Sequence, residues 1–118
     1  DMLELGGSSQ AEHEKLGRMC DPNLLSWVVV VGVAATQYLA PAARSTGCQV
    51  HVARNAIEAG EFVRSITEPG TVVLVKGSQN EIFLEECVKV LCDMTEDAEL
   101  VRQSDKWLAI KDKYFQQF

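Results

Sequence analysis

Residues that could bind an anion stand together where a run of apolar residues ends. Residues 72–75 are all apolar, and Lys76, Gly77 and Ser78 follow them directly. A glycine lets the backbone approach a bound group closely, the amides of a following helix can donate hydrogen bonds to it, and a lysine adds positive charge. This pattern is compatible with binding of an anion, such as a carboxylate or a phosphate, by Lys76, Gly77 and Ser78. The alternative is a solvated lysine in a tight turn between a strand and a helix.

Four other polar residues are candidates for binding a substrate. Asp1 and Glu4 lie in an acidic segment that we expect to follow a strand, where they could contact an ammonium group or order the loop. The alternative for both is a solvated loop whose apolar neighbours pack on the core. His13 and Asn80 are possible site residues. A lone helical histidine is, however, more often a cap or a packing partner.

The composition of the chain argues against several classes of protein. Its 118 residues suffice for a domain with a core, and 47% hydrophobic and 24% charged residues are usual for globular proteins. The net charge of −6 argues against a nucleic-acid surface, which depends on clustered lysine and arginine. The longest apolar run is too short to cross a bilayer, and no signal peptide is recognisable. We therefore expect a cytoplasmic protein without membrane insertion.

The four cysteines lack the spacing of a metal or redox motif. They form no C-x-x-C pair and do not cluster with histidine, so we expect reduced, mostly buried thiols and no metal site. These residues are Cys20, Cys48, Cys87 and Cys92.

Three short runs rich in β-branched residues are predicted strands, and the third of them contains Lys76. They span Trp27–Gly32, Cys48–Ala53 and Thr71–Gly77, and they start about 22 residues apart, which leaves room for one helix in each interval. Continuous valine runs are typical of strands covered on both faces, as in parallel sheets. The order predicts an α/β fold with a Rossmann-like, mostly parallel sheet and flanking helices.

The intervals between these runs carry helix signals. A helix is predicted from Ser8 or Ser9 to Cys20, and an alanine-rich helix over 34–45 is closed by Gly47. Asn55 is predicted to cap a third helix, and Glu68-Pro69-Gly70 to form the turn after it. The apolar residues of this third helix fall on one face: Ala56, Ala59, Phe62, Val63 and Ile66.

The charged residues of the later helices have the spacing of solvated faces. We expect Glu58, Glu61, Glu85 and Glu86 to face solvent, and Arg102 and Lys106 to be surface charges unless the tail docks. Residues 1–94 are predicted to form the α/β domain and 95–118 a C-terminal helical extension. Because the chain begins abruptly at Asp1 and three strands make a small sheet, we expect an N-terminally truncated domain that lacks its first strand or strands.

Three motifs in one order resemble a known family. They are "DMLELG" (Asp1–Gly6), "H-x-x-L-G" (His13, Leu16 and Gly17) and "LVKGS" (Leu74–Ser78). Together they resemble the C-terminal domain of the Mur ligases, and most closely the branch that adds D-alanyl-D-alanine. The resemblance extends from Asp1 to about Leu91. That family usually has an arginine after K-G-S, whereas Gln79 stands here.

The resemblance implies a function in peptidoglycan synthesis. The whole enzyme would be an ATP-dependent amide ligase, in which ATP phosphorylates the terminal carboxylate of a UDP-MurNAc-peptide and the amine of D-alanyl-D-alanine or an amino acid attacks the acyl phosphate. Its third domain would close over the active site and bind the incoming amino acid or dipeptide. The partners of this domain would be the N-terminal and central domains of the same ligase.

The resemblance also implies where the chemistry lies. ATP and Mg²⁺ would be bound mainly by the central domain, because this sequence has no G-K-[ST] loop and no set of Mg²⁺ carboxylates. We therefore expect no catalytic residue in this chain and no catalysis by it alone.

A second interpretation is a non-catalytic, flavodoxin-like regulatory or interaction module. A lysine at a strand end also occurs in response-regulator receiver domains. Those domains need an acidic residue at the end of the strand equivalent to Trp27–Gly32, and this sequence has none there.

Overall fold

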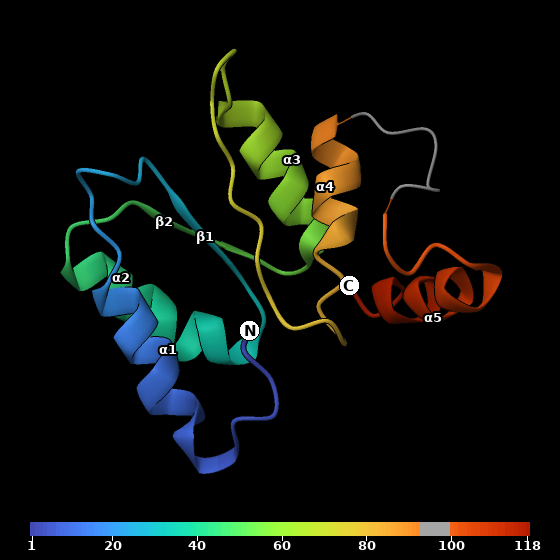
Figure 1. The fold of residues 1–118 in the computed structure, drawn as a ribbon, viewed down its shortest axis with the longest axis horizontal. Coiled ribbons are helices and arrows are strands. Elements are labelled where there is room, and N and C mark those ends of the chain that lie inside the picture. Colours follow the sequence, from blue (N-terminus) through green and yellow to red (C-terminus); the bar gives the residue numbers. More distant parts are fainter. Residues whose placement is uncertain (93–99) are drawn as a thin grey trace. The chain divides into compact units, whose positions relative to one another are not determined.

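The computed structural model describes residues 1–92 and 100–118. Their contacts divide the chain into two units, Asp1–Arg54 and Asn55–Phe118, and each is described by itself (Figure 1). The first unit holds a two-stranded parallel sheet with helices, so the chain is an α/β protein. The predicted boundary at residue 94 lies outside the described residues.

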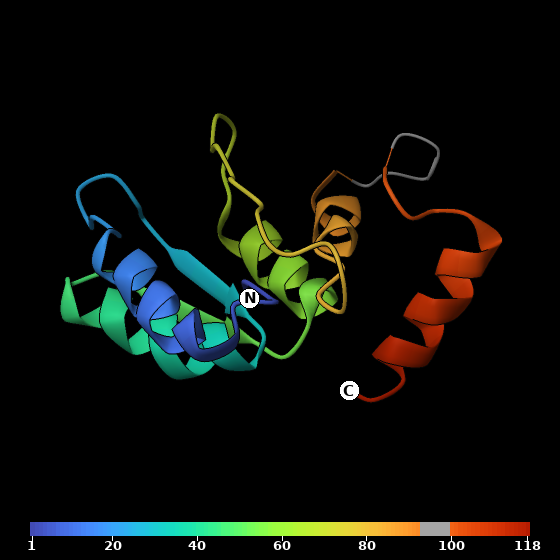
Figure 2. The same cartoon turned by 60° about the horizontal axis from the view of Figure 1, so that its bottom comes forward.

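The sheet of the first unit confirms two of the predicted strands. Strand β1 (Val28–Val31) runs parallel to β2 (Val50–Ala53), with Val28 opposite Val50. The turn η1 (Gly6–Ser8) leads into helix α1 (Ser9–Arg18), which lies beside helix α2 (Ala40–Ser45) (Figures 1 and 2). Helix α2 contacts both strands. The buried core between these elements consists of Val30, Ala35, Leu39, Ala40, Ala43 and Cys48.

The helix between the two strands begins with a wide turn. In η2 (Ala35–Leu39) the hydrogen bonds have π spacing, and the amide of Ala40 donates to the carbonyl of Ala35. Pro41 follows directly and has no amide hydrogen with which to continue an α-helical ladder, so it gives a local reason for this irregularity. Gly47, with φ +97°, follows the end of α2, as predicted.

Helices α1 and α2 approach closely because residue 17 is a glycine. A Cβ at Gly17 would lie 2.5 Å from the carbonyl oxygen of Leu39 and 2.6 Å from Cβ of Ala42. No side chain fits into that space without moving the backbone. The glycine of the H-x-x-L-G motif therefore has a packing function.

The second unit contains helices α3 (Ala56–Ile66), α4 (Glu85–Cys92) and α5 (Asp105–Phe115). The predicted cap of α3 is confirmed, because Oδ1 of Asn55 accepts a 2.9 Å hydrogen bond from the amide of Glu58. Helix α3 packs against α4 at Gly60, where a Cβ would lie 2.8 Å from Cβ of Val90. The predicted apolar face is buried at Ala56, Ala59 and Val63, whereas Ile66 is 38% exposed.

The prediction of a third strand at Thr71–Gly77 is wrong. The turn at Glu68–Gly70 forms, with the amide of Thr71 donating to the carbonyl of Glu68, but the residues after it are extended and irregular. A strand needs a neighbour to complete its backbone hydrogen bonds, and no described residue pairs with this segment as a strand. Val72 and Leu74 are consequently 93% and 86% exposed.

Within residues 1–92 and 100–118, the helices are too short or too polar to cross a membrane. The four cysteines are free thiols, of which Cys48 and Cys87 are buried.

Candidate functional site

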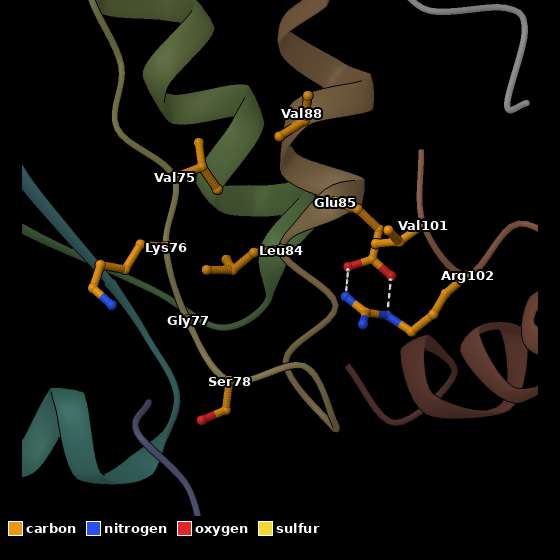
Figure 3. A pocket seen from close by; sticks show the side chains of 9 residues that line it. All are labelled: Val75, Lys76, Gly77, Ser78, Leu84, Glu85, Val88, Val101 and Arg102. Carbon is orange, nitrogen blue, oxygen red and sulfur yellow. Dashed lines mark hydrogen bonds and ion pairs between the residues drawn. The ribbon is translucent and has the colours of Figure 1, made fainter. Parts of the chain in front are cut away.

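The predicted anion-binding residues border a cavity in the second unit. Its volume is about 290 Å³, and three stretches of chain form it: the extended segment 75–78, the first turns of α4, and the residues just before α5 (Figure 3). The lining residues are Val75, Lys76, Gly77, Ser78, Leu84, Glu85, Val88, Val101 and Arg102.

Lys76 is the exposed cation of this cavity. Within the described part of the chain its ammonium group has no ion-pair partner, and its side chain points away from the Glu85–Arg102 pair (Figure 3). The segment that carries it passes alongside Leu84 and the start of α4. Lys76 is thus available to a ligand at the edge of the cavity.

Glu85 and Arg102 form a two-pronged ion pair in the cavity wall. Nε of Arg102 donates to Oε1 of Glu85 at 2.8 Å, and Nη2 donates to Oε2 at 2.7 Å (Figure 3). The Glu85 side chain is 4% exposed and that of Arg102 17%. Paired, charge-assisted bonds of this geometry fix the plane of the guanidinium group as well as its position.

A buried lysine from α5 completes the ion-pair cluster. Nζ of Lys111 lies 3.0 Å from Oε1 of Glu85 and also donates to Oε1 of Glu86. Lys89 lies 3.4 Å from the other oxygen of Glu86. The cluster of Glu85, Glu86, Lys89, Arg102 and Lys111 therefore joins α4 to the segment 100–118.

An aromatic cluster accompanies these ion pairs. Phe83 is 4% exposed and meets Trp107 and Tyr114 of α5 edge-on, with ring centroids 6.4 Å and 5.2 Å away. Phe83 has a φ of +50°, which is uncommon for a bulky residue. The tail docks on α4 through both apolar and charged contacts.

The ion pairs shift the ionisation of their partners. Burial alone would raise the pKa of Glu85, but the hydrogen bonds from Arg102 and Lys111 outweigh it and hold this pKa below its ordinary value of about 4.5. The hydrogen bond to Glu85 raises the pKa of Arg102 above its ordinary value. Both residues are charged throughout the physiological range.

The lowered pKa of Glu85 predicts a loss of stability in acid. Its contribution is fully present above the unfolded-state pKa near 4.5 and is lost as the pH falls through the lower, folded-state pKa. The difference in free energy of unfolding between the native chain and Glu85→Gln should therefore be largest at neutral pH and shrink below about pH 4.5. Urea denaturation followed by Trp107 fluorescence in a Trp27→Phe background measures it. Glu61→Gln, an exposed change on α3, should show no such trend, and a constant Glu85→Gln difference down to pH 3 would contradict the assignment.

Asp1 holds the start of the helical segment after β1. Its carboxylate accepts hydrogen bonds from the amides of Ala34 at 3.2 Å and Ala35 at 2.6 Å. Gly32, with φ +107°, leaves the space for it, because a Cβ there would lie 2.4 Å from Cγ of Asp1. A carboxylate is favourable at the amino end of a helix. Asp1 thus has a structural function in the first unit, and its contact with a ligand stays a prediction.

His13 is buried in the same unit and hydrogen-bonded at both ring nitrogens. The amide of Met2 donates to Nε2 at 3.0 Å, so Nδ1 carries the hydrogen and donates to the carbonyl of Ser9 at 2.7 Å. The side chain is 1% exposed. These contacts correspond to the packing alternative for His13.

The remaining candidates, Glu4 and Asn80, are exposed. Glu4 has a φ of +63°, and the carbonyl of Asn80 accepts a hydrogen bond from the amide of Ile82. Asp1, Glu4 and His13 belong to the first unit, and Lys76, Gly77, Ser78 and Asn80 to the second. In the first unit, Nε2 of His13 lies 3.9 Å from Oδ1 of Asp1. In the second unit, Lys76, Gly77 and Ser78 line one cavity together with Glu85 and Arg102.

The expectation that Glu85 faces solvent is wrong, and Arg102 is a partner in the cavity wall and not a free surface charge. Glu85 is buried because Arg102 and Lys111 neutralise it. One sequence signal could have indicated this: α4 begins with two adjacent carboxylates, and the segment 100–118 carries four cations, Arg102, Lys106, Lys111 and Lys113.

Comparisons with protein-family models, curated proteins and solved structures found no match for this sequence.

Proposed function

We propose that this chain provides the C-terminal, substrate-binding domain of a cytoplasmic, ATP-dependent amide ligase of the Mur type, with Rossmann-like architecture. The observation that carries the proposal is the cavity bordered by Lys76, Gly77 and Ser78, whose charged lining residues are two cations and one carboxylate. The carboxylate is already neutralised by Arg102 and Lys111, so the cavity favours an anion. The order of the three motifs in the sequence supports the family assignment.

In such a ligase the chain would bind and orient a substrate. Lys76 would hold a carboxylate of the incoming D-alanyl-D-alanine or amino acid, or a phosphate of the nucleotide, and Gly77 would let the backbone come close to it. ATP would activate the carboxylate of the UDP-MurNAc-peptide as an acyl phosphate. Because the described residues contain no group of acidic, histidine or cysteine side chains that could hold a metal, we assign them no Mg²⁺ ligand. The N-terminal and central domains of the ligase would supply that part.

Binding of the ligase substrates tests the proposal. We expect D-alanyl-D-alanine, ATP or a UDP-MurNAc-peptide, added separately to the ¹⁵N-labelled chain, to shift the amide resonances of residues 75–78. Lys76→Ala should weaken that binding about tenfold, because it removes a charge-assisted hydrogen bond. It should change the free energy of unfolding by less than about 0.5 kcal/mol, because Lys76 is exposed.

The matched control is Lys113→Ala, which removes the same charge from an exposed position on α5. It should leave the binding of these ligands unchanged. If none of the three ligands shifted residues 75–78, or if the two variants lost binding equally, the substrate-binding proposal would be refuted.

A second candidate function is that of a non-catalytic interaction module. The observation in its favour is the exposure of Val72 and Leu74, since contiguous exposed apolar residues often mark sites of protein contact. Such a module would bind none of the three ligase substrates. The titrations therefore separate the two functions.

A further inference from the structure

We propose that Arg102 is a second ligand-binding residue of the cavity, oriented by Glu85 to receive an oxyanion, so that the C-terminal segment 100–118 completes the binding site. The motifs that indicate the ligase end before this segment, and nothing in them points to Arg102. The inference deepens the proposed function and rests on it for the nature of the ligand, whereas the site itself follows from the geometry.

Glu85 and Lys111 fix the orientation of Arg102. Its Nε and Nη2 are bound to the two oxygens of Glu85, and Nζ of Lys111 holds the same carboxylate at 3.0 Å. Glu85 is almost completely buried, so the carboxylate cannot turn to follow solvent. The guanidinium plane is thus fixed before any ligand arrives, which lowers the entropic cost of binding.

Arg102 also has N–H donors that do not bind Glu85. A guanidinium group has more N–H donors than the two bonds to Glu85 require, and those on Nη1 point away from the carboxylate by the geometry of the fork. Arg102 lines the cavity that Lys76, Gly77 and Ser78 also border (Figure 3). Planar donors of this kind match the oxygens of a carboxylate or a phosphate.

The backbone of Arg102 has an unfavourable conformation. Its φ is +58°, a left-handed conformation that glycine and asparagine adopt with less strain. A strained residue persists where its surroundings fix it, and such residues cluster at ligand-binding sites. The ion pair to Glu85 supplies the fixing contact here, and the strained position places the guanidinium group in the cavity wall.

The side chains that line this cavity carry a net positive charge. The chain as a whole carries −6, but the charged residues that line this cavity are Lys76, Arg102 and Glu85, with a net charge of +1. Lys111 further offsets the one carboxylate. An anion that enters the cavity therefore meets a local positive charge in an acidic protein.

The test measures anion binding in the native chain. Inorganic phosphate and acetate are titrated separately at constant ionic strength into the ¹⁵N-labelled protein. The Nε–H resonance of Arg102 and the amide resonances of residues 76–78 are followed together. We expect all of these resonances to shift with the same dissociation constant. A shift with phosphate alone identifies a phosphate site, a shift with acetate alone a carboxylate site, and a shift with both a general oxyanion site. If both anions left the Arg102 resonance unmoved at saturation of residues 76–78, or if neither anion bound, the inference would be overturned.

Substitutions give a second, independent measurement. Asparagine tolerates the left-handed backbone, so Arg102→Asn should raise the dissociation constant at least tenfold through loss of the guanidinium group. Arg102→Lys keeps the charge but not the planar set of donors, and it should raise the constant less. Lys113→Gln removes one positive charge from an exposed position on α5 and should leave the constant unchanged. Equal losses in Arg102→Asn and Lys113→Gln would show that only net charge matters and would overturn the inference.

These outcomes are separate from those of the proposed function. If phosphate or acetate binds at Arg102 but no ligase substrate shifts residues 75–78, the anion site stands and the ligase proposal fails. If the ligase substrates bind at residues 75–78 while Arg102 stays unperturbed, the ligase proposal stands and the role of Arg102 fails.

Discussion

Replacing Gly17 by alanine is expected to lower the free energy of unfolding of the first unit by at least about 2 kcal/mol, although alanine is the better helix former. The added Cβ would lie 2.5 Å from the carbonyl oxygen of Leu39 and 2.6 Å from Cβ of Ala42, far inside normal contact distances. Neither neighbour is the end of a flexible side chain, so α1 would have to move away from α2. Urea denaturation followed by Trp27 fluorescence, in a Trp107→Phe background, measures the effect.

Gly7→Ala is the matched control for this substitution. A Cβ at Gly7 has no heavy atom within 4 Å, and its φ is not positive. Its effect should therefore stay within about 0.5 kcal/mol. Equal stability of the Gly17→Ala and Gly7→Ala chains would mean that α1 and α2 do not pack at the distance described.

Replacing Lys111 by methionine is expected to destabilise the second unit by about 3 kcal/mol. The substitution keeps most of the apolar length of the side chain, but it removes the cation that the buried Glu85 and the partly buried Glu86 share. Breaking a buried ion pair by removing one partner is costly because the remaining charge is desolvated. The measurement is urea denaturation followed by Trp107 fluorescence in a Trp27→Phe background.

Two comparisons isolate the buried charge as the cause. Lys113→Met removes a cation from an exposed position of the same helix and should cost less than about 0.5 kcal/mol. Adding Glu86→Gln to Lys111→Met should restore part of the stability, because without Lys111 the Glu86 carboxylate keeps only its 3.4 Å contact with Lys89. A double variant no more stable than Lys111→Met alone would contradict the electrostatic explanation.

The features that could be predicted from the sequence are those fixed by nearby residues. Asn55 caps α3 through the amide three residues later, and Gly47 ends α2 with a positive φ, so both signals lie within one turn of the helix they affect. The valine runs at β1 and β2 also had the right positions and the right parallel arrangement. For these elements the local pattern and the final structure agree.

The features that could not be predicted depend on distant residues. Thr71–Gly77 has the composition of a strand, yet a strand also requires a partner, and a run of valines carries no information on whether one is in place. Glu85 has the helical spacing of a solvated residue, and the docking of Arg102, 17 residues later, and of Lys111 makes its burial possible. Of the candidate site, the sequence therefore indicated Lys76, Gly77 and Ser78 but not the residues opposite them.

The long separation between Glu85 and its cations has a consequence for the order of events on the ribosome. Arg102 follows Glu85 by 17 residues, and Lys111 follows Glu86 by 25. Because translation proceeds from the amino end, a nascent chain that has released α4 but not these cations carries Glu85 without its partners and Glu86 with Lys89 alone. Helix α4 can therefore bury Glu85 only after the segment 100–118 has been synthesised. The cavity wall is then completed after α3 and the segment bearing Lys76 have already emerged.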